Sequence, residues 1–119
     1  MSSLSISLPP ITSDIQDDAR LKKAADTCFM MPIAGLLVKA QVYTGGIRGE
    51  VYNETRGRFQ DGQPIRTSGV KSAEMVQGFW VILTESSSRY VVVSLADFDA
   101  EDSFKHVIEW LRVNELPSD

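Results

Sequence analysis

Apolar and polar side chains alternate along residues 36–43 and again along residues 47–52. A period of two is typical of strands that bury one face. The pair of glycines at 45–46 predicts a two-residue turn between the two segments. We therefore predict a β-hairpin in which Tyr43 is paired with Arg48 and whose polar face is exposed and carries tyrosine–cation contacts.

A second hairpin is predicted further along the chain. Residues 79–84 form a continuous apolar run of strand length, and residues 89–95 are again mostly apolar after a loop of three serines. Such runs are typical of strands buried on both faces, so we place this hairpin at the centre of the sheet. A further short strand is predicted over residues 65–70, and the glycine-rich, charged residues 53–64 predict a surface loop.

Two helices flank these strands. Ser13, followed by acidic residues, predicts the start of a helix over residues 14–28, and Pro32 follows its end. Its apolar stripe is sparse, so docking on the sheet must hold it in place. A second helix is predicted to begin at Asp97 or Asp99, either of which can cap it. Its apolar residues have the i, i+3, i+4, i+7 spacing of a helix packed on a sheet: Phe104, Val107, Ile108 and Leu111.

This order of elements predicts an α+β domain. We expect four to five mostly antiparallel strands in a curled sheet with an N-terminal and a C-terminal helix, and specifically an SH3-like half-barrel. Residues 1–13 are rich in serine and proline, which predicts a flexible, extended leader before a single domain over residues 14–119. A half-barrel leaves strand edges unpaired, so a homodimer formed at such an edge stays open as a hypothesis.

The composition is ordinary for a globular protein. Of the 119 residues, 43% are hydrophobic and 24% are charged, which excludes wholesale disorder and a collagen-like scaffold. One cysteine cannot form an internal disulfide, and no apolar stretch approaches the roughly 18 residues of a membrane-spanning helix. With no cation before Arg20, the N-terminus also lacks the pattern of a signal peptide. We therefore expect a cytoplasmic protein without a membrane anchor.

Charge is distributed unevenly along the chain. Residues 39–71 hold six cations and three anions, a net charge of +3, whereas residues 97–119 hold two cations and seven anions, a net charge of −5. The central segment can therefore attract an anionic partner, while the C-terminal segment repels it. The pI near 4.9 argues against general nucleic-acid binding but is compatible with a local basic face.

The sequence contains no enzyme motif and no nucleotide-binding glycine motif. A nucleophilic site would have to use Cys28 or a serine together with His106, since the chain has one Cys and one His. We interpret His106 as a surface or boundary residue and Cys28 as a buried small apolar residue. These two residues are too few for a zinc site, and helix capping explains the acidic residues at 97–102. We therefore expect a non-enzymatic protein with no catalytic residues, no metal and no cofactor.

Two surfaces are candidates for binding a partner. The first is the polar face of the predicted hairpin with the loop after it, where Tyr and Arg, common interface anchors, gather; the same side chains can also do no more than cover the sheet. The second is an acidic face of the last helix, which either presents negative charge to a basic groove or is simply solvated. The first surface comprises Lys39, Tyr43, Arg48, Tyr52, Arg56, Arg58 and Arg66, and the second comprises Glu101, Asp102, Glu109 and Glu115.

A longer pattern spans residues 49–70 and 83–93. It combines a Gly-x-Val-Tyr strand, an Arg-Phe-x-Asp-Gly turn, an Ile-Arg-Thr-Ser strand and a Thr-x-Ser-x-Ser-x-Tyr hairpin. Its residues are Gly49, Val51, Tyr52, Arg58, Phe59, Asp61, Gly62, Ile65, Arg66, Thr67, Ser68, Thr84, Ser86, Ser88 and Tyr90. The pattern resembles a small domain of uncharacterised short proteins from bacterial phages, prophages and plasmids. The resemblance covers under half of the chain and brings no activity with it; it implies a mobile-element context, in which short proteins often bind a host factor.

From these observations we predict a non-enzymatic protein that binds another macromolecule. The predicted role is that of a modulator or inhibitor of a host complex, such as a defence system, acting by steric or electrostatic occlusion. The alternative is a small nucleic-acid-binding module that uses the face formed by residues 39–66, whose arginines and aromatic rings suit single strands. A hydrolase that uses Cys28 or His106 is a third hypothesis.

Overall fold

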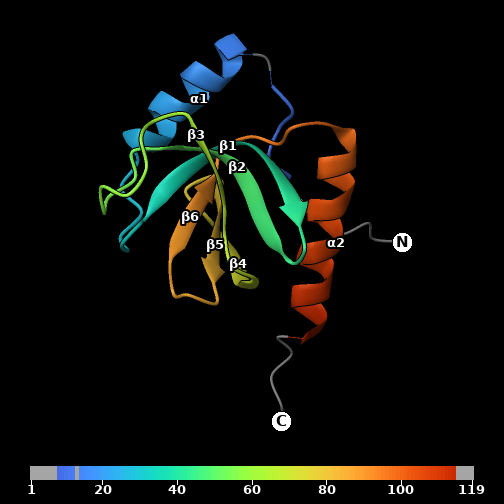
Figure 1. Ribbon diagram of the computed structural model, residues 1–119. Helices are drawn as coiled ribbons and strands as arrows, with labels where there is room; N and C mark the ends of the chain where they lie inside the picture. Colours follow the sequence, from blue (N-terminus) through green and yellow to red (C-terminus); the bar gives the residue numbers. More distant parts are fainter. Residues whose placement is uncertain (1–7, 13, 115–119) are drawn as a thin grey trace.

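The computed structural model describes residues 8–12 and 14–114 and has an α+β fold (Figure 1). Two helices accompany a six-stranded mixed sheet that is not closed, with the strand order β3-β2-β1-β6-β5-β4. The predicted α+β class, with one helix before the strands and one after them, is confirmed. The elements are α1 (Asp14–Ala25), β1 (Gly35–Tyr43), β2 (Gly46–Tyr52), β3 (Gln63–Arg66), β4 (Val70–Val76), β5 (Phe79–Thr84), β6 (Arg89–Val92) and α2 (Phe98–Asn114).

The number of strands differs from the prediction. The sheet has one parallel pair, β1 with β6, and four antiparallel pairs. The four to five predicted strands are too few because β4 was not recognised: its residues are partly exposed on both faces, so no alternation identifies it. Residues 67–69, predicted as part of a strand, connect β3 to β4. The turn between β4 and β5, Gln77 and Gly78 with φ of 53° and 85°, is a two-residue hairpin turn.

The β1–β2 hairpin is present, but its turn lies one residue earlier than predicted, which changes the partner of each β1 residue near the turn by two residues. Its turn lies at residues 44–45, where φ is 45° and 84°, so Tyr43 is paired with Gly46 instead of Arg48. The prediction failed because two adjacent glycines fit two neighbouring turn positions. A β-bulge after residue 38, where Lys39 has a φ of 56°, then changes the pairing. As a result Val38 belongs to the cluster that contains Phe79, whereas Ala40 belongs to the cluster that contains Trp80.

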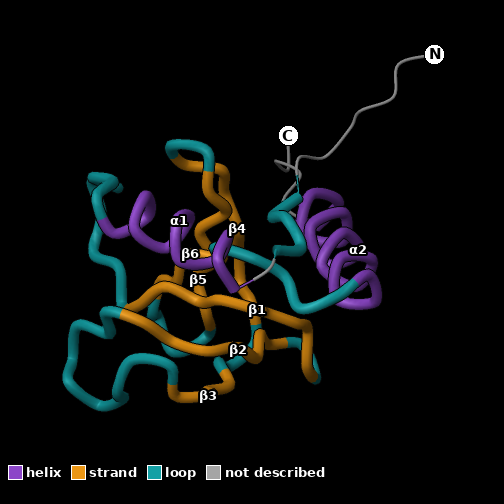
Figure 2. Tube along the Cα trace, turned by 90° about the horizontal axis from the view of Figure 1, so that it is seen from above, coloured by secondary structure: helices purple, strands orange, loops and turns teal. Residues whose placement is uncertain are grey.

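Side chains of the sheet form two cores, one on each face. α2 packs on the face that contains Leu37 and Trp80, where the rings of Phe104 and Trp80 meet edge to face with centroids 6.3 Å apart. α1 packs on the other face, where Ala24 joins a cluster that contains Phe79. Figure 2 shows the two helices on different sides of the strands. Successive residues of β5 therefore enter opposite cores, which confirms the predicted strand buried on both faces.

Helix α2 begins as predicted. The Asp97 Oδ1 atom accepts a hydrogen bond from the Ala100 N–H at 2.8 Å, so Asp97 is the N-cap residue. Phe104, Ile108 and Leu111 of the predicted apolar stripe are buried against the sheet. The 3.6-residue period of this stripe was therefore sufficient to predict both the helix and its buried face.

Helix α1 is shorter than predicted. It ends at Ala25, and the hydroxyl of Thr27 donates a hydrogen bond to the Lys23 carbonyl oxygen at 2.7 Å, which satisfies one of the free carbonyls of the last turn. Cys28 lies beyond the helix and is exposed. The interpretation of Cys28 as a buried residue is therefore wrong, because the helix that was to bury it stops before reaching it.

Residues 8–12 of the predicted leader lie against the sheet. The Leu95 N–H donates a hydrogen bond to the Pro10 carbonyl oxygen at 2.9 Å, and the segment forms a parallel bridge with Leu95. Apolar side chains of this segment pack against the core under α2. The rest of the predicted leader, residues 1–7 and 13, lies outside the described residues. No helix in the described part of the chain is long and apolar enough to cross a membrane.

Candidate binding surface

Two arginines face each other across neighbouring strands at one edge of the sheet. Arg48 of β2 is paired directly with Arg66 of β3, so their side chains share one face. Both guanidinium groups lie near the ring of Tyr43: its centroid is 5.9 Å from Cζ of Arg48 and 5.2 Å from Cζ of Arg66. Like charges at opposite positions repel, and the electron-rich ring partly offsets that repulsion. We name these three residues the Tyr43–Arg48–Arg66 cluster.

The cluster lines an open cleft of about 340 Å³ together with Pro64 and Ile65. The side chain of Tyr43 is 40% exposed, and both arginines are exposed. Within the described residues, neither arginine has an ion pair with a carboxylate. The predicted contact of Tyr43 with Arg48 is confirmed, although the strand pairing that produces it is different. The cleft is therefore a basic, aromatic surface without a charge partner in the described chain.

Lys39 and Tyr52, also predicted for this surface, lie in a different pocket under α1. This pocket, of about 240 Å³, contains Asp17, Asp18 and Glu50 as well. Burial, reinforced by the negative charges of Glu50 and Asp18, raises the pKa of Tyr52. Because three carboxylates surround the one lysine, this pocket is acidic and distinct from the Tyr43–Arg48–Arg66 cluster.

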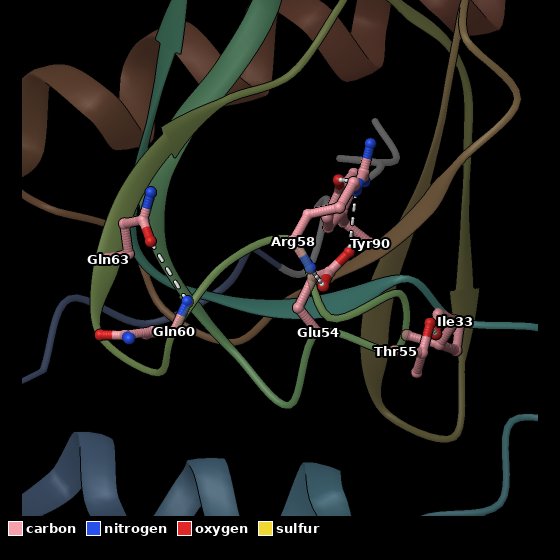
Figure 3. Close-up of polar contacts among 7 residues, drawn as sticks. All are labelled: Ile33, Glu54, Thr55, Arg58, Gln60, Gln63 and Tyr90. Atoms are coloured by element: carbon pink, nitrogen blue, oxygen red, sulfur yellow. Dashed lines mark hydrogen bonds and ion pairs between the residues drawn. The ribbon is translucent and has the colours of Figure 1, made fainter.

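Arg58 forms hydrogen bonds and an ion pair with Glu54 of its own loop (Figure 3). Its Nε donates to Glu54 Oε2 at 3.1 Å, its backbone N–H donates to Glu54 Oε1 at 2.8 Å, and its Nη2 lies 3.5 Å from the Tyr90 hydroxyl. The side chain of Glu54 has no exposed area. Its burial raises the pKa of Glu54, but the hydrogen bonds from Arg58 outweigh burial and leave that pKa below its usual value. The hydrogen bond to Glu54 in turn raises the pKa of Arg58, so the charge of this arginine is neutralised locally.

Further hydrogen bonds fix the same loop, residues 53–62. The Asn53 N–H donates to Asp61 Oδ1 at 2.9 Å, and the Gln60 N–H donates to Gln63 Oε1 at 3.2 Å, as Figure 3 shows for the second pair. The loop follows β2, so it lies at the end of the hairpin opposite the β1–β2 turn (Figure 2). The arginines of the loop therefore lie beyond one end of β2, whereas Arg48 and its partner Arg66 lie near the other end.

The seven residues predicted as one surface thus form three groups. Tyr43, Arg48 and Arg66 share the edge cleft, Lys39 and Tyr52 share the acidic pocket, and Arg56 and Arg58 belong to the distant loop. Arg89, which was not predicted as a site residue, lies at the start of β6 and lines a pocket together with Arg56. No local pattern connects these two arginines, because only the pairing of distant segments brings them together.

The structure describes three of the four acidic residues that were predicted to form a face of the last helix. Glu101, Asp102 and Glu109 lie on α2, whereas Glu115 lies outside the described residues. The carboxylate of Asp102 is 3.5 Å from Nδ1 of His106, and both side chains are about 70% exposed. The same helix exposes three large apolar side chains, Phe98, Trp110 and Val113.

The candidate residues for enzyme chemistry lie on different elements. The Sγ atom of Cys28 is 3.6 Å from the Met30 sulfur in the segment after α1, whereas His106 pairs with Asp102 on α2. In residues 8–12 and 14–114, no group of three or more His, Cys, Asp or Glu side chains is arranged to hold a metal ion. The basic cleft is therefore the strongest candidate site in the described structure.

The fold and these surfaces define an α+β protein with an uncovered basic and aromatic cleft at one sheet edge. Comparison of the chain with protein-family models, with curated protein sequences and with solved structures gives no match. The function is therefore inferred from the chemistry of the surfaces themselves.

Proposed function

We propose that this is a non-enzymatic cytoplasmic protein that binds an acidic surface of another protein through the Tyr43–Arg48–Arg66 cluster. The observation that carries the proposal is the direct pairing of Arg48 with Arg66, both near one exposed tyrosine ring and without a carboxylate partner among the described residues. Two uncompensated cations at opposite positions cost stability, so a role in binding explains their presence.

The chemistry of the cluster suits an acidic protein partner. Each guanidinium can hold a carboxylate through two parallel hydrogen bonds, and a tyrosine ring supplies apolar contact with little conformational entropy to lose. Arg and Tyr are also the residues that most often contribute large shares of binding free energy at interfaces. The cleft lies beside the edge strand β3, which leaves room for the partner to approach.

The wider role that we propose is modulation of a host complex by a protein of a mobile element. The resemblance to short phage and plasmid proteins supports this context, and a small domain that covers an acidic binding surface would act by occlusion. We further propose that the open sheet is curled into a half-barrel of the SH3-like kind. The parallel pairing of β1 with β6 was not predicted for this sheet.

A second candidate function is the binding of single-stranded nucleic acid at the same cleft. The 40% exposed ring of Tyr43, with a guanidinium near it from each of two strands, supports this alternative because bases stack on such platforms. The net charge of −4 favours the protein partner, because it repels a polyanion such as nucleic acid more strongly than a local acidic patch on a protein.

The test is affinity capture of the tagged protein from lysate of its host, with and without nuclease. The double variant Arg48→Gln/Arg66→Gln is compared with Arg112→Gln, which removes one exposed arginine from α2. We expect a stoichiometric protein that the wild type and the Arg112 variant capture despite nuclease, and that the double variant loses. Recovery of nuclease-sensitive material alone would support the second candidate, and equal capture by the double variant would exclude the cluster as the binding surface.

A further inference from the structure

A second basic pocket lies at the end of the molecule opposite the Tyr43–Arg48–Arg66 cluster. It has a volume of about 310 Å³ and is formed by the loop after β2, the segment before β1 and the turn before β6. Its polar lining consists of two arginines and three hydroxyl residues, namely Arg56, Arg89, Thr55, Ser87 and Ser88. No function discussed above uses Arg89.

Backbone hydrogen bonds bring the two arginines together. The Thr55 N–H donates to the Ala34 carbonyl oxygen at 2.9 Å, and the Ala34 N–H donates to the Arg89 carbonyl oxygen at 2.7 Å. The hydroxyl of Thr55 also donates to the Ile33 carbonyl oxygen at 3.3 Å, a pair drawn in Figure 3. The loop is therefore tied to the same short segment that holds the start of β6, so that Arg56 and Arg89 line one pocket.

The positive charge of this pocket is not neutralised within the described structure. Neither Arg56 nor Arg89 forms an ion pair with a described carboxylate. The carboxylate of Glu54 already accepts two hydrogen bonds from Arg58, and it accepts the backbone N–H of Arg56 as well. Guanidinium groups are well suited to holding an oxyanion through two parallel hydrogen bonds.

The hydroxyl side of the pocket is held in a fixed turn. Ser87 has a φ of 67°, in the left-handed region, and its N–H donates to the Thr84 carbonyl oxygen at 2.8 Å. The Ser88 N–H donates to Thr84 Oγ1 at 3.2 Å, and the Thr84 N–H donates to the Ser88 carbonyl oxygen at 2.9 Å. These hydrogen bonds fix the turn, and Ser87 and Ser88 line the same pocket as Arg56.

We propose that this pocket binds a phosphate group. Two arginines and two serines from different segments line this pocket. Several donors on different segments suit a tetrahedral oxyanion with three or four acceptor oxygens better than a planar carboxylate. The phosphate can be free or the terminal group of a phosphate monoester, since both present the same oxygens. The proposal is independent of the proposed function, because it uses none of the residues of the edge cleft.

The test is a titration of the 119-residue protein, followed by amide chemical shifts in ¹⁵N NMR spectra. Inorganic phosphate, a nucleoside 5′-monophosphate and acetate are the separate probes. We expect saturable shifts at residues 55–56 and 87–89 with phosphate and the nucleotide, and much weaker ones with acetate. Tighter binding of the nucleotide than of phosphate assigns the natural ligand to the monoesters, and equal or weaker binding assigns it to free phosphate.

Three variants make the test specific. Arg56→Gln and Arg89→Gln should each weaken phosphate binding by about tenfold or more, as expected for the loss of one charge-assisted contact. Arg48→Gln/Arg66→Gln serves as the matched control and should bind phosphate like the wild type. Arg56 is exposed, so its variant should fold even if that of Arg89 does not. Absence of saturable shifts at these residues, or wild-type affinity of the Arg56 variant, would overturn the proposal.

Discussion

Arg48 and Arg66 are directly paired across β2 and β3, and both guanidinium groups lie within 6 Å of the centre of the Tyr43 ring. Two cations at opposite positions of neighbouring strands destabilise a sheet, whereas a cation near an aromatic face gains attraction. The pair therefore combines a cost in stability with a surface ready for an anionic partner. We therefore expect these arginines to lower the stability of the fold and to raise the affinity for a partner.

The first prediction concerns the opposite effects of Arg66 on stability and on binding. Arg66→Gln should leave the free energy of unfolding unchanged or raise it by up to about 0.5 kcal/mol, because it removes the cross-strand repulsion. The same substitution should weaken capture of the partner. Urea denaturation measures the first effect and the affinity capture described above measures the second; a clear loss of stability would show that Arg66 has a structural role.

The close approach of two chain segments at the β1–β2 turn gives a second prediction. A Cβ atom on Gly46 would lie 2.4 Å from the Thr67 carbonyl oxygen and 2.8 Å from that of Ser68. Because both oxygens belong to the backbone, Gly46→Ala requires a shift of the chain, and we expect it to lower the free energy of unfolding by about 3 kcal/mol.

Gly78→Ala is the matched control for that substitution. Gly78 has a φ of 85°, but a Cβ atom there would meet nothing within 4 Å. Only the backbone conformation opposes the substitution, so the expected loss is about 1 kcal/mol. Chemical denaturation of both variants measures the difference, and an equal or smaller loss for Gly46→Ala would contradict the tight contact with residues 67–68.

A third prediction concerns pH and the Glu54–Arg58 pair. Because the pKa of Glu54 in the folded protein lies below its value in the unfolded chain, the ionised carboxylate stabilises the fold at neutral pH. That stabilisation is fully present above the unfolded pKa of about 4.3 and is lost as the pH falls through the lower folded pKa. Glu54→Gln should therefore lower Tm at pH 7, and the difference in Tm from the wild type should shrink below about pH 4.

Limited proteolysis provides a second readout for the same pair. Trypsin cleaves after arginine, and Arg56 and Arg58 both lie in the loop over residues 53–62. Loss of the charged hydrogen bonds should loosen this loop, so Glu54→Gln should be cut there faster than the wild type at pH 7. A difference in Tm that is the same at pH 7 and pH 3 would show that the charge of Glu54 is unimportant.

The fourth prediction compares two residues of α2. Phe104 is 1% exposed and its ring packs against Trp80, so Phe104→Ala should lower the free energy of unfolding by about 3–5 kcal/mol. Val113 is 67% exposed, so Val113→Ala should change stability by less than about 0.5 kcal/mol. Thermal unfolding followed by circular dichroism measures both, and similar effects of the two substitutions would contradict the docking of α2 on the sheet.

The elements predicted correctly are those whose pattern is complete within one segment. The stripe of α2 and the apolar runs of β5 and β6 each repeat over enough residues to identify type and buried face. β4 was missed because its residues are partly exposed on both faces, and the register of β1 with β2 was misplaced because two turn positions were locally equivalent. The first error concerns the existence of a strand and the second the alignment of two strands, and both depend on contacts with neighbouring strands.

The candidate sites also combine features of one segment, which were predicted, with features that depend on distant segments, which were not. The residue types of the Tyr43–Arg48–Arg66 cluster and the contact of Tyr43 with Arg48 were predicted from the hairpin alone. The pairing of Arg48 with Arg66 was not, because β3 joins the sheet across a loop whose path has no sequence signal. The same loop pairs Arg58 with Glu54 and places Arg56 in one pocket with Arg89, so the surface that had been predicted as continuous is divided.

The sequence by itself determined the α+β class, the two hairpins and the chemistry available at the surface. It did so because hydrophobic period, turn residues and charge are properties of short segments. Only the tertiary structure decided which arginines have carboxylate partners and which face each other without one. The reason is physical: the effect of a charge depends on the distance and burial of its neighbours, and strands and loops distant in the chain supply those neighbours.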